Sequence, residues 1–417
     1  MAPTWHKPRR YKHFDLPVSQ KFLGDLTEPS FVSSHPMSPL LYYKKEERRY
    51  KPGIGKTVTK RRPIMYASHR DAAILSYYAD QLNKALGKYY EYHSISDFSI
   101  AYRALGLSNY DFSAEAYRFA VENSPCTILA FDVSGFFDHL DHGLLKARLK
   151  RVLGLKSLTV DWLRVFRFVT RFTYVELESL KVHPTFAPRF KERGPALIGT
   201  VADLKKNGIQ FHPNPKGTVG IPQGTPISAV LSNVYMIDFD KSAANLCAEA
   251  GAFYRRYSDD ILIISSEAAA DGIQNSIETL IGAEKLSLSA DKTERTMLEL
   301  DLAKPSGKAA QYLGFAYYPG GAGLRPGSLS RQWRKMKRQV NRAKSFAEKS
   351  LAAGNSGKVF TKSLRRRFSA LPFRNFSSYA RRSAGAFGTG EKITSQIRKL
   401  ERRFEAEMRQ LKAIEKK

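Results

Sequence analysis

The chain has 417 residues, 42% of them hydrophobic, so it is long enough for two or three domains and too apolar to be disordered. Its formal net charge of +29 indicates a polyanionic partner, and its two cysteines exclude a disulfide framework and a cysteine-rich zinc site. The basic excess is concentrated in residues 321–417, which hold 26 Lys and Arg against 6 Glu and no Asp. This distribution predicts a phosphate-binding surface, and the alternative is a solvated basic tail.

The beginning of the chain lacks the apolar stretch of a signal peptide. No apolar run approaches the length that spans a membrane. We therefore expect a soluble, cytoplasmic protein without a membrane partner. No feature of the sequence indicates an oligomeric state.

The first elements, in chain order, are an arm, a turn and a helix. About fifty residues rich in Pro, Tyr and charge are expected to form an extended arm around other parts of the molecule. A loop or hairpin turn is predicted over Lys51–Lys60, because this segment contains Pro, Thr and two Gly. The apolar spacing then predicts a helix over Ser68–Leu86.

The middle of the chain alternates strands and helices. The predicted elements are a buried strand at Thr127–Val133, helices near Gly143–Val152, Asp161–Phe172 and Ser228–Asn245, a hairpin at Phe253–Ser265, a helix near Ala270–Ile281 and a strand at Tyr312–Tyr317. After Pro326 the pattern is wholly helical and basic. Its clearest amphipathic face consists of Ile393, Ile397, Leu400, Phe404, Met408 and Leu411. This order predicts an α+β domain with a small antiparallel sheet and an α-helical appendage.

Three aspartates lie where strands end. The segment F-Y-R-R-Y-S-D-D-I-L-I-I-S places Asp259 and Asp260 at the predicted tip of the hairpin. Adjacent carboxylates repel each other, and this cost is best tolerated where a cation lies between them. If the strand that ends at Asp132 lies beside the hairpin, Asp132 and Asp259 could share two Mg²⁺ ions, as phosphoryl transfer requires. The alternative is an ordinary Asp-rich turn.

Five motifs in this order resemble those of a reverse transcriptase palm. They are F-D-V-S-G-F-F-D-H-L-D-H around Asp132, G-I-P-Q-G-T-P-I-S-A-V-L-S-N (Gly220–Asn233), Y-S-D-D (Tyr257–Asp260), L-S-A-D-K-T (Leu288–Thr293) and Y-L-G-F (Tyr312–Phe315). R-P-I (Arg62–Ile64) and R-D (Arg70–Asp71) resemble the fingers motifs of group II intron and related bacterial enzymes. The resemblance runs from about residue 60 to 315 and implies a right-hand polymerase with palm, fingers and thumb.

The resemblance also implies a role for each motif residue. Asp132 and Asp259 would be metal ligands, with the carbonyl of Val133 completing the shell and Asp260 as a supporting catalytic carboxylate. The implied cofactor is two Mg²⁺ ions, with Mn²⁺ as an alternative. Lys292 would be a general acid for the leaving pyrophosphate or a neutraliser of phosphate charge, unless it is an ordinary surface lysine.

Two further groups of residues would bind the substrates. The group implied for the dNTP is Lys60, Arg62, Arg70, Phe137 and Gln223, with Arg61 as an alternative within the charge run. A ring at Phe137 would collide with a ribose 2′-OH and favour deoxynucleotides, unless it is an ordinary core Phe. The group implied for template and primer is Gly224, Tyr257, Tyr312, Leu313, Gly314 and Phe315.

The expected domains are an amino-terminal arm over 1–50, fingers over 51–126, a palm over 127–320 and a basic helical thumb over 321–417. An insertion at about 173–216 is expected to belong to the fingers. The residues after Gly321 contain no Asp, and every His lies at or before His212. We therefore expect neither a ribonuclease H domain nor a carboxyl-terminal His-type endonuclease.

The motifs that are present and absent narrow the choice among subgroups of reverse transcriptases. The N-A-x-x-H and V-T-G strings of retron enzymes do not occur, and Gln223-Gly224 differs from the variant in diversity-generating enzymes. The chain is most similar to defence-associated (antiphage) bacterial reverse transcriptases. This implies cDNA synthesis on a dedicated non-coding RNA template, with a DNA or RNA primer and dNTPs. Alternatives are a group II intron-like or retron-like enzyme with another template, protein-primed or template-independent DNA synthesis, and a non-catalytic RNA-binding scaffold.

Overall fold

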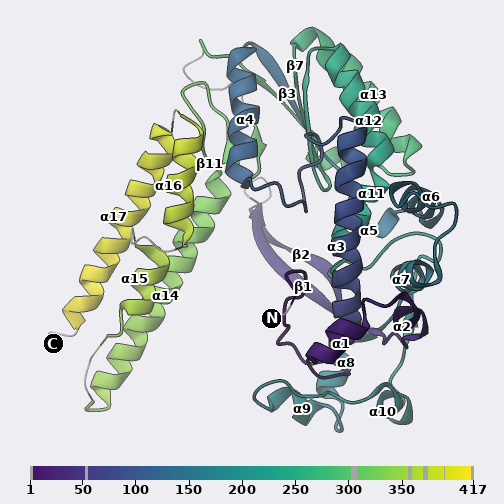
Figure 1. Cartoon of the computed structure of the whole chain (residues 1–417). Helices are drawn as coiled ribbons and strands as arrows, with labels where there is room; N and C mark the ends of the chain where they lie inside the picture. The colour runs from purple at the N-terminus through teal and green to yellow at the C-terminus, as the bar shows by residue number, and fades with distance from the viewer. Residues whose placement is uncertain are drawn as a thin grey trace.

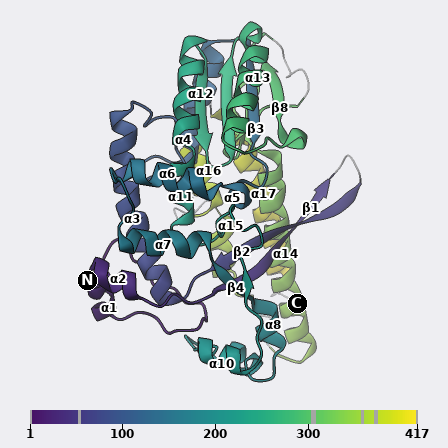
Figure 2. The same cartoon turned by 90° about the vertical axis from the view of Figure 1, so that its right-hand side faces the viewer.

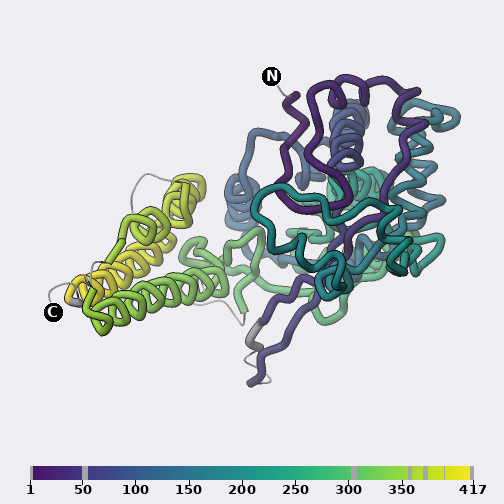
Figure 3. Tube along the Cα trace, turned by 90° about the horizontal axis from the view of Figure 1, so that it is seen from below, coloured from purple at the N-terminus to yellow at the C-terminus, as the bar shows by residue number. Residues whose placement is uncertain are grey.

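The computed structural model describes residues 3–51, 55–301, 308–355, 359–369, 374–388 and 390–414. A mixed body of sheets and helices is joined to a carboxyl-terminal bundle of helices, which lies to the left in Figure 1. The bundle and one long β-hairpin project from the body in different directions (Figure 3). Within the described residues, no helix is both long and apolar enough to cross a membrane.

The central sheet has the strand order β6-β7-β3-β8 and is antiparallel throughout. Its strands are β3 (Cys126–Asp132), β6 (Phe253–Tyr257), β7 (Asp260–Ser265) and β8 (Glu294–Leu298). Strands β3 and β7 are apolar along nearly their whole length, because both of their faces are buried. The predicted strand and hairpin are therefore confirmed, and the predicted antiparallel sheet is present.

Helices pack on both faces of this sheet (Figure 2). One core contains residues of α3 (His69–Tyr92), α6 (His142–Val152), α7 (Val160–Thr170), α11 (Ser228–Tyr235), α12 (Ile237–Glu249) and α13 (Glu267–Ala283). The core on the opposite face contains residues of α4 (Asn109–Glu122) and of a small sheet of β9 (Gln311–Tyr312), β10 (Phe315–Ala316) and β11 (Gly323–Leu324). The helix predicted over 228–245 is thus two helices that meet at Met236, and the single strand predicted over 312–317 is a hairpin.

A second sheet has the strand order β2-β1-β4-β5. Strand β1 (Leu40–Lys51) pairs antiparallel with β2 (Lys56–Tyr66) to form the long hairpin, and it pairs in parallel with β4 (Thr173–Glu176). Strand β5 (His212–Pro213) pairs with β4, so the predicted insertion contributes β4 and the edge strand β5 to this sheet. The expectation of an extended arm over the first fifty residues is wrong for 40–50, which belong to β1.

The amino-terminal segment and the insertion share a small core. It comprises Phe14, Leu41, Val175, Leu180, Phe186, Ile198 and Leu204. The N–H of Ile198 donates to the carbonyl of His13 at 2.9 Å, and the ammonium of Lys12 donates to the carbonyl of Glu192 at 2.6 Å. The short helices of these two regions are α1 (Gln20–Asp25), α2 (Pro29–Ser34), α8 (Leu177–Val182), α9 (Ala187–Lys191) and α10 (Val201–Lys206).

The bundle contains α14 (Pro326–Ala352), α15 (Lys362–Phe368), α16 (Phe376–Ala386) and α17 (Glu391–Ile414). All six apolar residues predicted on one face of the last helix are buried, so this amphipathic helix is confirmed. Helix α16 packs against α4 and thereby attaches the bundle to the body, where the rings of Tyr379 and Tyr110 lie 5.4 Å apart. The polar faces of α14 and α17 remain exposed and carry most of the Lys and Arg of the bundle.

Candidate active site

The structure brings the three predicted aspartates together at one end of the central sheet. Asp132, the last residue of β3, lies directly opposite Asp260, the first residue of β7. Tyr257 pairs with Asp260, so Ser258 and Asp259 form the two-residue turn between β6 and β7. The N–H of Val133 donates to the carbonyl of Asp259 at 3.0 Å, a typical length for a backbone hydrogen bond. Two segments more than a hundred residues apart therefore meet as the sequence predicts.

Lys292 lies in the same site. Its ammonium donates to Oδ1 of Asp132, and its backbone is held by the short helix η2 (Ala290–Lys292). The N–H of Ser289 donates to the carbonyl of Asp132 at 2.8 Å, which fixes this segment along the end of β3. Lys292 therefore lies beside the aspartates, and its charge offsets that of Asp132.

The donor atoms in this site fit a hard divalent cation. Within the described part of the chain, no three His, Cys, Asp or Glu side chains are grouped so that they could hold a metal ion. Mg²⁺, however, commonly takes only one or two carboxylates and completes its shell with water and substrate phosphates. The carboxylates of Asp132 and Asp259 provide such oxygens, and the contact of Asp132 with an ammonium shows that this carboxylate attracts a cation. Val133, whose carbonyl is predicted to complete the metal shell, follows Asp132 directly in the chain and has a buried side chain.

Among the carboxyl groups of the site, Asp260 has the clearest change in pKa. The surrounding protein removes water from its carboxylate, and the nearby charges of Asp259 and Asp132 oppose its ionisation, which together raise its pKa to about 6. Lys292 and Arg325 act in the opposite direction and offset part of this effect. Part of Asp260 remains accessible to water, so a ligand can reach it.

This raised pKa predicts a pH-dependent change in stability. Because Asp260 binds its proton more tightly in the folded than in the unfolded chain, its contribution to stability falls as the pH rises from about 4 to about 6. We expect Asp260→Asn, which cannot ionise, to be more stable than the wild type at pH 8 in EDTA. The difference should shrink towards pH 4–5. Thermal unfolding midpoints across this range check the prediction, and a difference that does not vary with pH would contradict it.

A buried ionic network holds the turn that carries Asp259. Arg256 is fully buried and donates to both carboxylate oxygens of Asp240, at 2.7 and 2.6 Å. Its Nη1 donates to the carbonyl of Ser258 at 3.0 Å, and its Nη2 donates to Oγ of Ser99 at 3.0 Å. Burial lowers the pKa of an arginine, but the Asp240 carboxylate more than offsets this and raises the pKa of Arg256. Arg256 thus ties the position of the catalytic turn to the core.

A second contact reaches the same turn from the segment before α4. The hydroxyl of Tyr102 donates to Oγ of Ser258 at 3.3 Å, and the rings of Tyr102 and Tyr257 lie 6.4 Å apart. Both Tyr102 and Ser258 have positive φ, at 62° and 61°, which is uncommon for residues other than glycine. Sequence analysis missed Arg256, Asp240 and Tyr102. The one available signal was the pair Arg255-Arg256, two charges within a strand whose other residues are aromatic.

The loop before α11 lies against the long hairpin. The N–H of Met65 donates to the carbonyl of Gln223 at 2.9 Å. Gly224 has φ +121°, and a Cβ there would lie 2.6 Å from the carbonyl oxygen of Met65, so only glycine fits this approach. The N–H of Ile221 donates to the carbonyl of Phe137 at 2.9 Å, which places Phe137 beside the same loop. The predicted residues Phe137, Gln223 and Gly224 are therefore neighbours.

The three cations predicted to bind the triphosphate lie on two different elements, β2 and α3. Lys60 and Arg62 lie on β2, where Arg62 donates to Glu47 at 2.9 Å and Lys60 is in register with the same glutamate. Arg70 lies at the start of α3, and its guanidinium carbon is 5.7 Å from the centre of the Phe22 ring. This contact places Arg70 against the amino-terminal segment.

Two of the residues predicted to hold the primer have buried side chains. Tyr312 is 5% exposed and Phe315 is fully buried, because both pack in the core that faces α4. Their side chains are therefore not available to a primer, which corrects the prediction for them. Leu313 and Gly314 form the accessible turn between β9 and β10, with φ of +45° and +97°. Tyr257 remains partly exposed.

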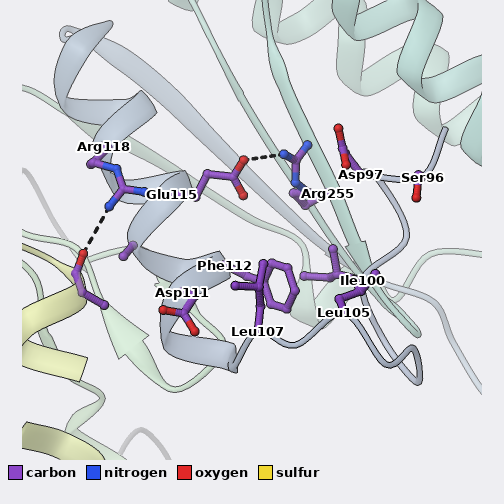
Figure 4. Close-up of a pocket in the computed structure, with 12 residues that line it drawn as sticks. Ser96, Asp97, Ile100, Leu105, Leu107, Asp111, Phe112, Glu115, Arg118 and Arg255 are labelled. Carbon is purple, nitrogen blue, oxygen red and sulfur yellow. Dashed lines mark hydrogen bonds and ion pairs between the residues drawn. The ribbon is translucent and has the colours of Figure 1, made fainter. Parts of the chain in front are cut away.

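A separate pocket lies where the bundle meets the body (Figure 4). It has a volume of about 630 Å³ and is lined by α4, the segment before it, Arg255 and Ala386. Arg255 donates to Glu115 at 2.5 Å, and Arg118 donates to the carbonyl of Ala386 at 3.1 Å. None of the predicted site residues lines this pocket, so it is distinct from the cluster of aspartates.

Carboxylates from two adjacent strands, a glycine loop against a basic hairpin and a basic helical bundle are together typical of nucleotidyl-transferring polymerases. Comparison with known protein families identifies the family within this class. Residues 50–317 match the family described as "Reverse transcriptase (RNA-dependent DNA polymerase)". The chain therefore belongs to the reverse transcriptase family.

Comparison with solved structures finds distant likenesses. Apo telomerase from Candida tropicalis, truncated from the C-terminal domain, has 12% identity and a TM-score of 0.45, covering 69% of this chain and 56% of that chain. Telomerase from Candida albicans in complex with the TWJ fragment of telomeric RNA has 13% identity and a TM-score of 0.43. The match covers 91% of this chain and 58% of that chain. The chain thus spans less than two thirds of the length of these telomerases. No curated protein matches the chain.

Proposed function

We propose that the chain is an RNA-directed DNA polymerase that extends a primer with dNTPs on an RNA template and produces cDNA. The observation that carries this proposal is the meeting of Asp132 with Asp259 and Asp260 at the end of the central sheet, in a chain of the reverse transcriptase family. A right-hand arrangement follows, with the central sheet as palm, the sheet that contains the long hairpin as fingers and the bundle as thumb.

The residues present would hold Mg²⁺ or Mn²⁺, with Asp132 and Asp259 as ligands and Val133 and Asp260 in support. When bound, such ions stabilise the negative charge on the attacking and leaving oxygens of a phosphoryl transfer. Asp132 would then exchange its contact with Lys292 for this cation. The freed ammonium would be placed to donate a proton to the leaving pyrophosphate or to neutralise its charge.

Other residues of the chain would position the substrates. Phe137, next to the glycine loop, would exclude a ribose 2′-OH by steric collision. Gly224 would allow the backbone to approach the nucleotide or template closely. The exposed basic faces of α14 and α17 would bind the phosphates of a template–primer duplex, which they would recognise by its shape and backbone. The exposed cations on α14 are Arg331, Arg334, Lys335, Lys337, Arg338, Arg342, Lys344 and Lys349.

The proposal extends to the RNA template and the biological role of the enzyme. We infer from the motif resemblance a cytoplasmic antiphage enzyme that copies a dedicated non-coding RNA. Sequencing the RNA that copurifies with the protein tests this directly, because one enriched RNA species supports a dedicated template. A random pool of cellular RNA would contradict it and favour an enzyme with another template source.

Primer extension tests the proposed activity and the role of Phe137 together. With an oligo(dT) primer on poly(rA), we expect the wild type to incorporate dTTP and to discriminate strongly against UTP. Phe137→Ala should retain dTTP incorporation and accept UTP at least about tenfold better, because removal of the ring opens space for the 2′-OH. A wild type that prefers UTP would contradict the proposed deoxynucleotide selection. A wild type that incorporates neither would favour an RNA-binding scaffold.

A further inference from the structure

Lys216 and His139 form a contact next to the catalytic loop that the sequence motifs do not include. Nζ of Lys216 lies 3.1 Å from Nε2 of His139, and Nδ1 of the same imidazole lies 3.1 Å from the carbonyl oxygen of Ser134. Lys216 comes from the end of the insertion, whereas Ser134 is two residues after Asp132. The contact therefore connects the insertion to the loop that carries the first catalytic aspartate.

The hydrogen bonds determine how the imidazole is oriented. A carbonyl oxygen can only accept, so Nδ1 of His139 carries the proton and donates to Ser134. Nε2 then has a free lone pair, which accepts a hydrogen bond from the ammonium of Lys216. An imidazole that accepts in this way holds the position of Lys216 without cancelling its charge.

The backbone fixes both residues close to the catalytic loop. The imidazole lies over Gly135, because a Cβ at that glycine would be 2.7 Å from Cε1 of His139. The segment after Lys216 runs beside the segment of His139 through hydrogen bonds from His142 to Thr218 at 3.1 Å and from Gly220 to Leu140 at 2.8 Å. Gly220, with φ +83°, allows this approach. The pair is consequently part of a rigid framework that continues into the glycine loop.

Lys216 differs in its partner from three other cations of this region. Arg62 is paired with Glu47, Lys285 with Asp141 and Lys292 with Asp132. Among the ion pairs of the described residues, none joins Lys216 to a carboxylate. Both Lys216 and His139 are exposed, so an anion in the site can reach the ammonium.

We propose that Lys216, positioned by His139, binds the terminal phosphates of the incoming nucleoside triphosphate. This rests on the proposed function, because a nucleotide that reacts at the aspartates has its α-phosphate there and its β- and γ-phosphates beyond it. The charge of these terminal phosphates needs a cation that is not already neutralised, and Lys216 supplies one beside the loop that follows Asp132. The insertion thus contributes directly to nucleotide binding.

Steady-state primer extension tests the proposal. We expect Lys216→Met to raise the KM for dTTP about tenfold, because it removes a charge-assisted hydrogen bond, and to change kcat little. Lys216→Arg should retain most of the affinity. The affinity for the primer–template duplex, measured by fluorescence anisotropy, should not change. Lys206→Met, which removes an exposed charge at the end of α10, is the matched control and should behave as the wild type.

The role of His139 is tested by a double-mutant cycle. His139→Ala should raise the KM for dTTP by several-fold, because the ammonium loses its orientation. The double variant of His139→Ala with Lys216→Met should be no worse than Lys216→Met alone, since the imidazole acts through the lysine. A merely structural effect of His139 would instead add to that of Lys216→Met.

A binding experiment separates this proposal from the polymerase assignment. Inorganic tripolyphosphate is titrated into the free protein by calorimetry, and we expect Lys216→Met to weaken its binding. If the wild type polymerises but Lys216→Met leaves both the KM and tripolyphosphate binding unchanged, the phosphate site is wrong and the polymerase stands. If tripolyphosphate binding depends on Lys216 but no polymerisation occurs, the phosphate site stands and the polymerase is wrong. Weaker duplex binding with an unchanged KM would assign Lys216 to the nucleic-acid backbone and overturn the proposal.

Discussion

Asp259→Asn is expected to reduce the rate of dNTP incorporation by on the order of 10³-fold or more, while the protein remains folded and binds RNA. The substitution removes a charged oxygen donor from the two-residue turn that faces Asp132. A loss of several kcal/mol of charge stabilisation in the transition state corresponds to a rate effect of this size. Single-turnover primer extension at saturating dNTP measures it.

The matched control is Asp271→Asn, which removes a carboxylate from the exposed surface of α13. Asp271 pairs with Arg295 at the surface, and such pairs contribute little to stability. We expect this variant to retain full activity. Equal losses in both variants would show that the effect of Asp259→Asn is one of overall charge, and activity that survives Asp259→Asn would refute the assignment of the catalytic aspartates.

Arg256→Met is expected to destabilise the fold by about 3–5 kcal/mol, because it leaves the carboxylate of Asp240 buried without its cation. Both side chains are fully buried, and the carboxylate accepts two hydrogen bonds from the guanidinium. The shift of the urea unfolding midpoint measures the change. A destabilisation below about 1 kcal/mol would be that of an exposed pair and would contradict the buried network.

Arg256→Met combined with Asp240→Leu separates stability from positioning. Because both charges are removed together, we expect the double variant to recover part of the lost stability. It should not recover activity, since the carbonyl of Ser258 still lacks its donor and the turn that carries Asp259 is no longer held. Full recovery of both properties would show that Arg256 has no influence on the catalytic turn.

The sequence predicted the structure best at positions where the chemistry requires one particular type of residue. A carboxylate at the end of an apolar strand and an aspartate pair at a hairpin predicted the meeting of Asp132 with Asp259. The glycine before a helix predicted a loop that something approaches closely, but not that the carbonyl of Met65 would lie against Gly224. These features follow from local patterns, because alternation defines the strands and the breaks in alternation define the turns. The α+β fold class and the amphipathic last helix were predicted on the same basis.

The contacts that the sequence did not predict depend on which elements pack together. Tyr312 and Phe315 belong to a matching motif, but the hairpin that contains them packs its side chains against α4. Arg70 also belongs to a matching motif and lies against Phe22. The partners of Arg256 come from three separate segments, which contribute Ser99, Asn233 and Asp240. No local pattern indicates such long-range pairings.

The small core shared by Phe14 and the insertion makes the amino end of the chain a poor place for truncation. Deleting the first fifteen residues would remove Phe14 from Phe186 and Ile198, and would take away the carbonyl of His13 that accepts from Ile198. Strands β4 and β5 of the hairpin's sheet would then lose the support of helices α8, α9 and α10, which connect them. Purification tags are better attached at the carboxyl end, where the last helix points away from that sheet (Figure 1).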